Sequence, residues 1–192
     1  MIKENFTYNL LRFKENSIYN QKLHAITIFP YENIHTAGTL TKMILNLSLK
    51  EVDFNKKKAL PFFLAMELLT NQKCIATLSS KNIITWKLRK GALVGCKVTL
   101  RNTNLFEFID NLNLTFPRME KFKGIDLHSF IKKPTNAFSL IITELILFYP
   151  IELGLGINTE VKKIEIKFLF KNFSSQEKIF LLTTNRLPLN IK

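Results

Sequence analysis

The sequence predicts an α+β fold in which helices pack on one face of a largely antiparallel sheet. Four stretches alternate apolar and polar residues with a period of two, which is typical of half-buried strands. Stretches with apolar residues three and four positions apart separate them, as expected for amphipathic helices. The resulting order is helix, strand, helix, strand, strand, helix, strand, strand, helix. We expect the 192 residues to form a single domain (1–192) with an N-terminal extension over residues 1–38.

The first third of the chain begins with a short amphipathic pattern over residues 4–18, followed by a segment over residues 17–38 that we expect to be loop-rich. From Thr39 to Lys50, apolar and polar residues alternate with a period of two. One face of this predicted strand is apolar and the other is polar and partly basic. The apolar face comprises Met43, Leu45, Leu47 and Leu49, and the polar face comprises Lys42, Asn46, Ser48 and Lys50.

The next segments read as a helix, a loop and a strand. Lys56–Thr70 predicts a helix, with Leu60, Phe63, Leu64, Glu67 and Leu68 at helical offsets. Pro61 falls in the first turn, where its missing N–H is tolerated. Residues 75–82 are small and polar without periodicity, which predicts a flexible loop. Residues 83–89 alternate and predict a strand.

The central stretch, Gly91–Arg101, has the clearest alternation in the chain. Cys96, Val98 and Leu100 are expected to be buried, while Lys97, Thr99 and Arg101 share the opposite face. On its own this pattern favours an ordinary antiparallel strand with a solvated face, and the alternative is a sheet that presents hydrogen-bond donors to an anionic partner.

The last third begins with Thr103 as the expected N-cap of a helix. Residues 137–143 predict a strand, and a short apolar turn ends at Pro150. Residues 163–171 alternate again. Ser174-Ser-Gln-Glu177 is a capping box that opens the final helix, which is expected to end near Asn185.

The charge balance points to a polyanionic partner. The chain has 28 Lys and Arg against 15 Asp and Glu, a net charge of +13. Such a surplus favours nucleic acid first and an acidic membrane surface second. The longest apolar run, over residues 137–150, is too short to cross a bilayer, so no membrane insertion is expected.

Composition also bears on the compartment. Asn, Ile, Lys, Leu and Phe are abundant, whereas Gly, Ala and Arg are scarce, which indicates a gene rich in A/T codons, such as an organelle's. The N-terminus has no apolar signal core. Cys74 and Cys96 are far apart in the sequence and form neither a disulfide framework nor a zinc pattern.

Catalytic chemistry has little support. His24, His35 and His128 are scattered, and none has a nucleophile or a carboxylate at a recognisable spacing. Gly91 and Gly95 lack the Gly-Lys-Ser/Thr ending of a phosphate loop. We therefore expect no enzyme activity, no catalytic residue, no metal and no cofactor.

A set of motifs occurs in a fixed order at close spacing. The motifs are Asn71-Gln-Lys73, Lys87-Leu-Arg-Lys-Gly91, Gly95-Cys-Lys-Val-Thr-Leu-Arg101, Phe106-Glu-Phe108, Phe116-Pro-Arg118, Phe122-Lys-Gly124 and Phe138-Ser139, with Glu144 and Phe148 to Pro150 following. Over roughly residues 39–188 the chain thereby resembles the universal large-subunit ribosomal protein L-five family. That family binds 5S ribosomal RNA and has an antiparallel sheet with helices on one side.

The resemblance implies a 5S rRNA contact through Asn46, Gln72 and Thr99. Lys97 and Arg101 are expected beside Thr99 as phosphate partners, and Lys73, Lys87 and Arg89 complete the predicted RNA-binding set. Residues 76–82 fall where the family has a loop that contacts transfer RNA, with Ser79, Ser80 and Lys81 at its tip.

The implied partners are 5S and large-subunit rRNA, P-site tRNA, neighbouring large-subunit proteins and a small-subunit head protein across an intersubunit bridge. Departures from the family pattern are Ser48 in place of a glycine, Thr135-Asn-Ala-Phe-Ser-Leu140 without its glycines, and few cations in the loop. Divergence and A/T bias together suggest a mitochondrial, organelle-encoded member, with a plastid or bacterial form as the alternative. A free-standing RNA-binding regulator or maturation factor is the alternative function, and a membrane-surface protein is a third.

Overall fold

The computed structural model describes residues 20–31, 33, 35–49, 56–86, 88–119, 122–126, 137–143, 145–153, 163–171 and 174–190. The chain divides into two compact units. The central unit comprises Ile44–Leu100 and Ser139–Ile166. The terminal unit comprises the chain up to Met43, Arg101–Phe138 and Lys167–Lys192. The predicted helix over residues 4–18 lies outside the described residues.

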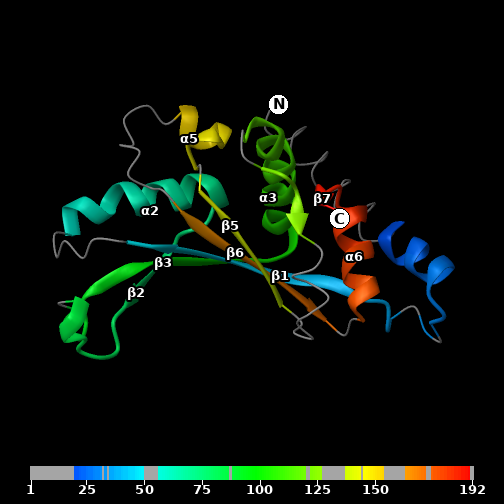
Figure 1. Cartoon of the computed structure of the whole chain (residues 1–192), viewed down its shortest axis with the longest axis horizontal. Helices are drawn as coiled ribbons and strands as arrows, with labels where there is room; N and C mark the ends of the chain where they lie inside the picture. Colours follow the sequence, from blue (N-terminus) through cyan, green and yellow to red (C-terminus); the bar gives the residue numbers. More distant parts are fainter. Residues whose placement is uncertain are drawn as a thin grey trace. The chain divides into compact units, whose positions relative to one another are not determined.

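The main sheet has five strands in the order β2-β3-β1-β6-β5 and is antiparallel, which confirms the predicted α+β class (Figure 1). A second, two-stranded sheet pairs β4 with β7 in parallel. The strands are β1 (Thr39–Ser48), β2 (Ile75–Leu78), β3 (Leu93–Leu100), β4 (Ile125–Asp126), β5 (Ala137–Ile142), β6 (Ile164–Lys171) and β7 (Leu189–Asn190).

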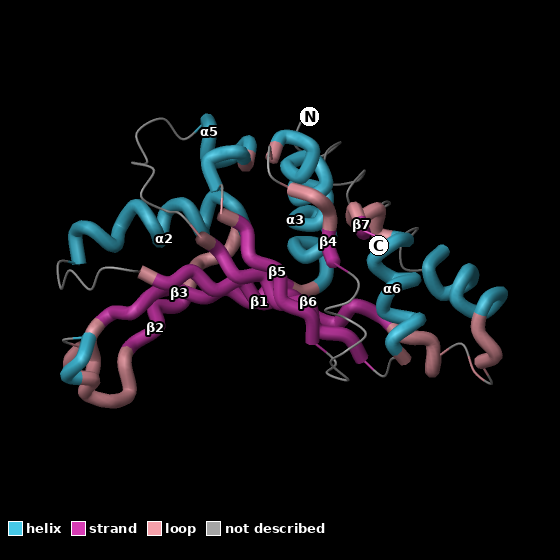
Figure 2. The backbone as a smooth tube through the Cα atoms, in the orientation of Figure 1, coloured by secondary structure: helices cyan, strands magenta, loops and turns pink. Residues whose placement is uncertain are grey.

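The helices are α2 (Lys56–Thr70), α3 (Asn102–Thr115), α5 (Tyr149–Leu153) and α6 (Ser175–Thr184), and residues 20–28 are also helical. Short 3-10 segments are η1 (Ile84–Trp86), η2 (Phe116–Arg118) and η3 (Leu145–Leu147). Figure 2 shows how these helices and loops alternate with the strands along the backbone.

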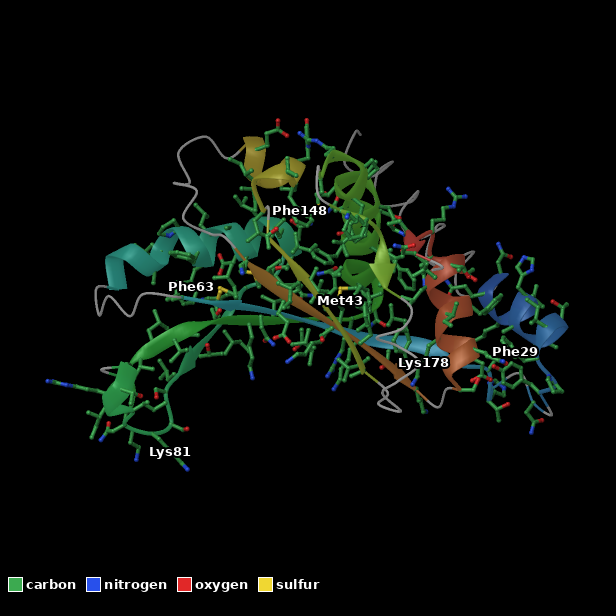
Figure 3. All side chains as sticks on the ribbon, in the orientation of Figure 1. Phe29, Met43, Phe63, Lys81, Phe148 and Lys178 are labelled. Carbon is green, nitrogen blue, oxygen red and sulfur yellow. The ribbon has the colours of Figure 1, made fainter. Side chains whose placement is uncertain are left out.

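In the central unit, α2 packs along one face of β3 and also contacts α5. The buried side chains of α2 follow helical spacing, because residues three and four apart share one side of a helix. On the sheet, Leu45 and Leu47 of β1 and Cys96 and Val98 of β3 are also buried. Figure 3 shows Phe63 between α2 and the strands. The buried residues of α2 are Ala59, Ala65, Met66, Leu69 and Thr70.

The terminal unit is built around α3 and α6. Leu105, Phe108 and Leu112 of α3 are buried. The capping box of α6 is confirmed: Ser174 Oγ accepts from Glu177 N, and Glu177 Oε2 accepts from Ser174 N at 2.7 Å. Both ends of α6 are therefore fixed by local hydrogen bonds, since the N–H of Asn185 donates to the carbonyl oxygen of Leu181 at 3.1 Å.

The helix over residues 20–28 lies beside α6 within this unit, as Figure 1 shows. Gln21 Nε2 donates to Asn185 Oδ1 at 2.8 Å, and Tyr31 Oη donates to Glu177 Oε1 at 2.5 Å. The rings of Phe29 and Phe180 meet edge to face with centroids 5.8 Å apart. The expectation of a loop-rich segment over residues 17–38 is therefore wrong for residues 20–28, whose helix is stabilised by packing on α6 rather than by strong local signals.

Several other local predictions are corrected. Residues 75–78 form strand β2 because they pair with β3, although their own pattern is weak. Residues 84–86 form a 3-10 turn instead of a strand, closed by the antiparallel bridge between Ile83 and Leu88. Arg101, not Thr103, is the N-cap of α3, and it makes no side-chain cap hydrogen bond. Pro150 lies inside α5 rather than ending a turn.

The predicted helix over residues 56–70 is confirmed as α2, but its buried residues are not the ones singled out by their helical offsets. Leu60 and Leu64 are 64% and 50% exposed, while Ala59, Ala65 and Met66 are buried. Apolar residues surround this helix almost completely, so periodicity alone could not select the face. The side of α2 that bears two alanines packs inward, because small side chains allow close approach to the sheet.

Candidate nucleic-acid interface

The polar face of β3 is exposed as predicted. Lys97 and Thr99 are exposed, whereas their neighbours Cys96, Val98 and Leu100 are buried. Alternation therefore places an ammonium and a hydroxyl group two residues apart on one side of the sheet. This side faces away from the buried side chains that pack against α2, so within the central unit it is open to a partner.

Asn46 of β1 lies on the same open face. The N–H of Leu49 in the β1 chain segment donates to the carbonyl oxygen of Val94 in β3 at 2.9 Å. Because the two strands are antiparallel, counting three residues along each strand from this pair brings Asn46 level with Lys97. Asn46 Nδ2 also donates to Glu165 Oε2 of β6 at 3.3 Å. The carboxylate orients the amide and disfavours a phosphate beside it. Asn46 is therefore better suited to a ribose hydroxyl or a base edge than to the backbone of a nucleic acid.

The turn out of α2 positions Gln72 and Lys73. Asn71 adopts a left-handed conformation (φ 51°), and its N–H donates to the carbonyl oxygen of Glu67 at 2.9 Å, which ends the helix. Thr70 Oγ1 donates to the carbonyl oxygen of Gln72 at 3.2 Å. Lys73 is exposed two residues before β2, and Gln72 is half-buried. The turn thus leads directly into the strand that pairs with β3.

The connection between β2 and β3 is an ordered extension of the hairpin. Ser79 N donates to the carbonyl oxygen of Ala92, and Gly91 N donates to that of Ser79, both at 2.9 Å. Nearer the tip, Lys90 N donates to Asn82 Oδ1 at 2.6 Å. Backbone and side-chain hydrogen bonds therefore span the hairpin, in contrast to the flexible loop predicted over residues 75–82.

The tip of this hairpin carries more charge than the sequence suggested. Lys81 and Ser80 are exposed, as predicted, and Figure 3 shows Lys81 projecting from the tip. Arg89 and Lys90 are exposed in the same hairpin. Sequence reasoning missed Lys90 and placed Arg89 on a strand, because the turn at residues 84–86 was not recognised.

The predicted RNA-binding residues therefore separate into groups. Asn46, Lys97 and Thr99 share the open face of the sheet, and Gln72 and Lys73 lie at the turn into β2. Arg89 belongs to the hairpin tip, and Lys87 lies outside the described residues. Arg101 is exposed and extended one residue beyond β3, and it belongs to the terminal unit.

The two cysteines lie beneath this face. Cys74 Sγ lies 3.7 Å from Glu67 Oε1 and 3.8 Å from the carbonyl oxygen of Phe63. Burial raises the pKa of Cys96 to about 12, with smaller contributions from the neighbouring Cys74 thiol and from Glu67. Burial likewise raises the pKa of Cys74. Both groups are therefore neutral thiols at physiological pH, which fits a packing role rather than nucleophilic chemistry.

Among the described residues, no group of three or more His, Cys, Asp or Glu side chains is arranged to hold a metal ion. In the same part of the chain, no helix has the length and apolar character needed to cross a membrane. The arrangement instead offers ammonium, hydroxyl and amide groups on an open sheet face, and cations on a projecting hairpin. The molecule is therefore an α+β protein with a surface suited to binding a polyanion. Its cations can neutralise the charge of the polyanion, and its hydroxyl and amide groups can form hydrogen bonds with polar groups of the partner.

Comparison with known proteins identifies the family. Residues 93–189 match the model of the C-terminus of the ribosomal L5 family. The chain is also 34% identical over 170 residues to the large ribosomal subunit protein uL5m of Reclinomonas americana, covering 88% of this chain and 92% of that protein. The chain belongs to the ribosomal L5 family, and it is accordingly a ribosomal protein.

Proposed function

We propose that this chain is a structural protein of the large subunit of a mitochondrial ribosome, where it binds 5S rRNA in the central protuberance. The observation that carries the proposal is the open face of the central unit, on which Asn46 lies level with Lys97 and next to Thr99. The similarity to a uL5m protein supports the mitochondrial assignment. The protein acts by binding and positioning RNA rather than by catalysis, and it uses no cofactor.

The three side chains have different tasks in this proposal. Lys97 neutralises a phosphate as a point charge, and Thr99 donates to or accepts from a ribose hydroxyl. Asn46, oriented by Glu165 at 3.3 Å, reads a base edge or a 2′-hydroxyl. Gln72, Lys73 and Arg101 extend the contact along the RNA and towards neighbouring large-subunit rRNA.

The hairpin tip is assigned to transfer RNA. Ser79, Ser80 and Lys81 reach P-site tRNA, and Arg89 adds charge to that contact. Hydrogen bonds across the hairpin support this assignment, because an ordered projection loses less entropy on binding than a flexible loop. The chain also contacts neighbouring large-subunit proteins and a small-subunit head protein across a bridge.

We further propose that residues 1–192 act as one RNA-binding domain, with residues 1–38 as an extension. The boundary between the two units falls inside β1, β5 and β6, so three strands are common to both. The contacts of Gln21 and Tyr31 with α6 support an extension that packs on the terminal unit.

Binding to 5S rRNA at several salt concentrations tests the sheet contact. Lys97→Ala is expected to weaken binding and to reduce the slope of log K against log salt by roughly 0.7 to 0.9, because one phosphate contact is lost. Thr99→Val keeps the strand-favouring branched shape and loses the hydroxyl. It is expected to weaken binding about fivefold, as for one hydrogen bond of about 1 kcal/mol, without changing the slope.

Lys123→Ala provides the matched control, since Lys123 is an exposed cation of the terminal unit outside the proposed face. Equal losses for Lys97→Ala and Lys123→Ala would refute the sheet contact. Co-sedimentation with large subunits separates the proposal from its alternative, a free-standing RNA-binding regulator, which would remain in the soluble pool.

A further inference from the structure

The outer side of α2 carries a ridge of leucines. Leu60 is 64% exposed, Leu64 is 50% exposed and Leu68 is half-buried. Because these residues are four positions apart, they follow one another along one side of the helix. The opposite side of α2 packs on β3, and Figure 1 shows α2 along the sheet, with α5 towards its C-terminal end. The helix is therefore apolar on the side that packs and also on the side that does not.

A surface helix normally carries polar side chains on its outer side, and a helix that is apolar all round is normally buried. Leu114 of α3 illustrates an ordinary exposed leucine: it is 72% exposed, but Asp110 and Asn111, one turn earlier, are polar. The leucines of α2 are instead contiguous along the helix. Contiguous exposed apolar side chains mark interaction sites, so we infer that a partner covers this ridge.

The shape of the ridge favours a helix as the partner. Side chains four residues apart form a row that fits the groove between corresponding rows of a second helix. From Leu60 to Leu68 the row is about 12 Å long, which two to three turns of a partner helix can cover. A bilayer is a poorer match, because Glu67 lies three residues after Leu64 on the same side and its carboxylate would enter hydrocarbon.

The charge of α2 favours an acidic partner. The helix begins with Lys56-Lys57-Lys58, and its first turn contains no acidic residue. The N-terminal end of a helix is the positive end of its dipole, so cations are unfavourable there and anionic groups are favourable. Carboxylates of a partner would offset this positive charge. A second copy of this chain would add to it, because each copy has a net charge of +13.

We propose that the outer side of α2 is the docking site for an acidic amphipathic helix of a neighbouring large-subunit protein. Leu60 and Leu64 pack into the apolar side of that helix, and its Asp and Glu residues lie near the N-terminal end of α2. The inference rests on the proposed function, because it assigns one protein contact of the large subunit to a defined surface. That surface is separate from the RNA face, which lies on the side of the sheet away from α2.

Photo-crosslinking of the full-length chain within assembled large subunits tests the docking site. The photoreactive residue p-benzoylphenylalanine replaces Leu64, and mass spectrometry maps the crosslinked peptide. We expect a peptide of another large-subunit protein in which apolar residues recur every three or four positions among Asp and Glu. The same photoreactive residue in place of Leu114 is the control and should not capture that peptide. Capture of rRNA, lipid, a second copy or a basic segment, or no capture, would overturn the inference.

A pair of double variants measures the contribution of the ridge. Leu60→Glu combined with Leu64→Glu places two carboxylates against an acidic helix, so the crosslinked protein should be depleted from purified large subunits about tenfold, which corresponds to about 1.4 kcal/mol. Leu60→Met combined with Leu64→Met keeps an apolar ridge and should retain that protein.

The Glu variant should keep the circular dichroism spectrum and the 5S rRNA affinity of the parent chain, because both leucines are exposed and lie away from the RNA face. Undiminished amounts of the crosslinked protein in subunits carrying this variant would overturn the docking site and leave the 5S contact standing. A parent chain that neither enters large subunits nor binds 5S rRNA would overturn both.

Discussion

Gly95 is the position where the fold of the proposed interface is most sensitive to a single added carbon. A Cβ atom at this residue would lie 2.2 Å from the carbonyl oxygen of Leu47 and 3.1 Å from Ser48 Cα. Both partners are backbone atoms of β1, so neither can rotate away. Gly95→Ala must therefore open the spacing between β1 and β3, which also carries Asn46 and Lys97.

The expected loss follows from the severity of this overlap. Forcing an extra carbon into a tightly packed interior costs about 1 to 3 kcal/mol, and contact with fixed backbone points to the upper end, about 3 kcal/mol. For a chain of this size each kcal/mol lowers Tm by about 2 to 4 °C, so the melting temperature of Gly95→Ala should fall by about 6 to 12 °C. Thermal unfolding followed by far-UV circular dichroism measures the change.

Gly91→Ala is the appropriate control. Gly91 has no atom within 4 Å of an added Cβ, and only its positive φ of 83° opposes the substitution. Such backbone strain costs about 1 kcal/mol, which corresponds to a Tm lower by about 2 to 4 °C. If Gly95→Ala lost no more stability than Gly91→Ala, the close approach of β1 and β3 would not be rigid and the reasoning would fail.

Two further predictions concern stability. Ser174→Ala removes half of the capping box and should cost about 1 kcal/mol, seen as a Tm lower by about 2 to 4 °C, while Gln176→Ala at an exposed position of the same turn should change Tm little. The Cys96 pKa, raised from 9.0 to about 12, means that the unfolded thiol ionises first as pH rises. The unfolding free energy should therefore fall between pH 9 and 12, by about 1.4 kcal/mol at pH 10 from this group. In urea-unfolding measurements at a series of pH values, Cys96→Ala should reduce the fall of the unfolding free energy between pH 9 and 12. If the unfolding free energy of the variant fell with pH as steeply as that of the parent chain, the Cys96 thiol would not be shielded from ionisation in the folded state.

Much of the sheet could be predicted from local pattern. In β1, β3 and β6 the buried and exposed residues alternate, so a period of two in the sequence was sufficient to place Met43, Cys96 and Ile164 inward and Lys97 outward. The capping box at Ser174 and Glu177 was equally local, because both partners lie within one turn. The family, too, was indicated by motifs within β3 and its flanks.

Other features depended on contacts between distant segments. Residues 75–78 become a strand only because β3 supplies hydrogen-bond partners, and residues 20–28 become a helix beside α6. In α2, nearly every side is apolar, so the sheet rather than the sequence selected Ala59 and Met66 as the buried side. In each case the local preference was weak, and a long-range contact supplied the missing free energy.

The amino-acid sequence by itself determined the alternation of β3 and hence the exposure of Lys97 and Thr99, since each side of a strand is set by the spacing of neighbouring residues. Only the tertiary structure decided which side chains of other segments lie beside Lys97 and Thr99. The antiparallel register placed Asn46 of β1 level with Lys97 and placed Ile75 of β2 opposite Lys97. The turn at residues 84–86 carried Arg89 and Lys90 to the hairpin tip. Register and turn geometry depend on hydrogen bonds between separate segments, which a one-dimensional pattern does not contain.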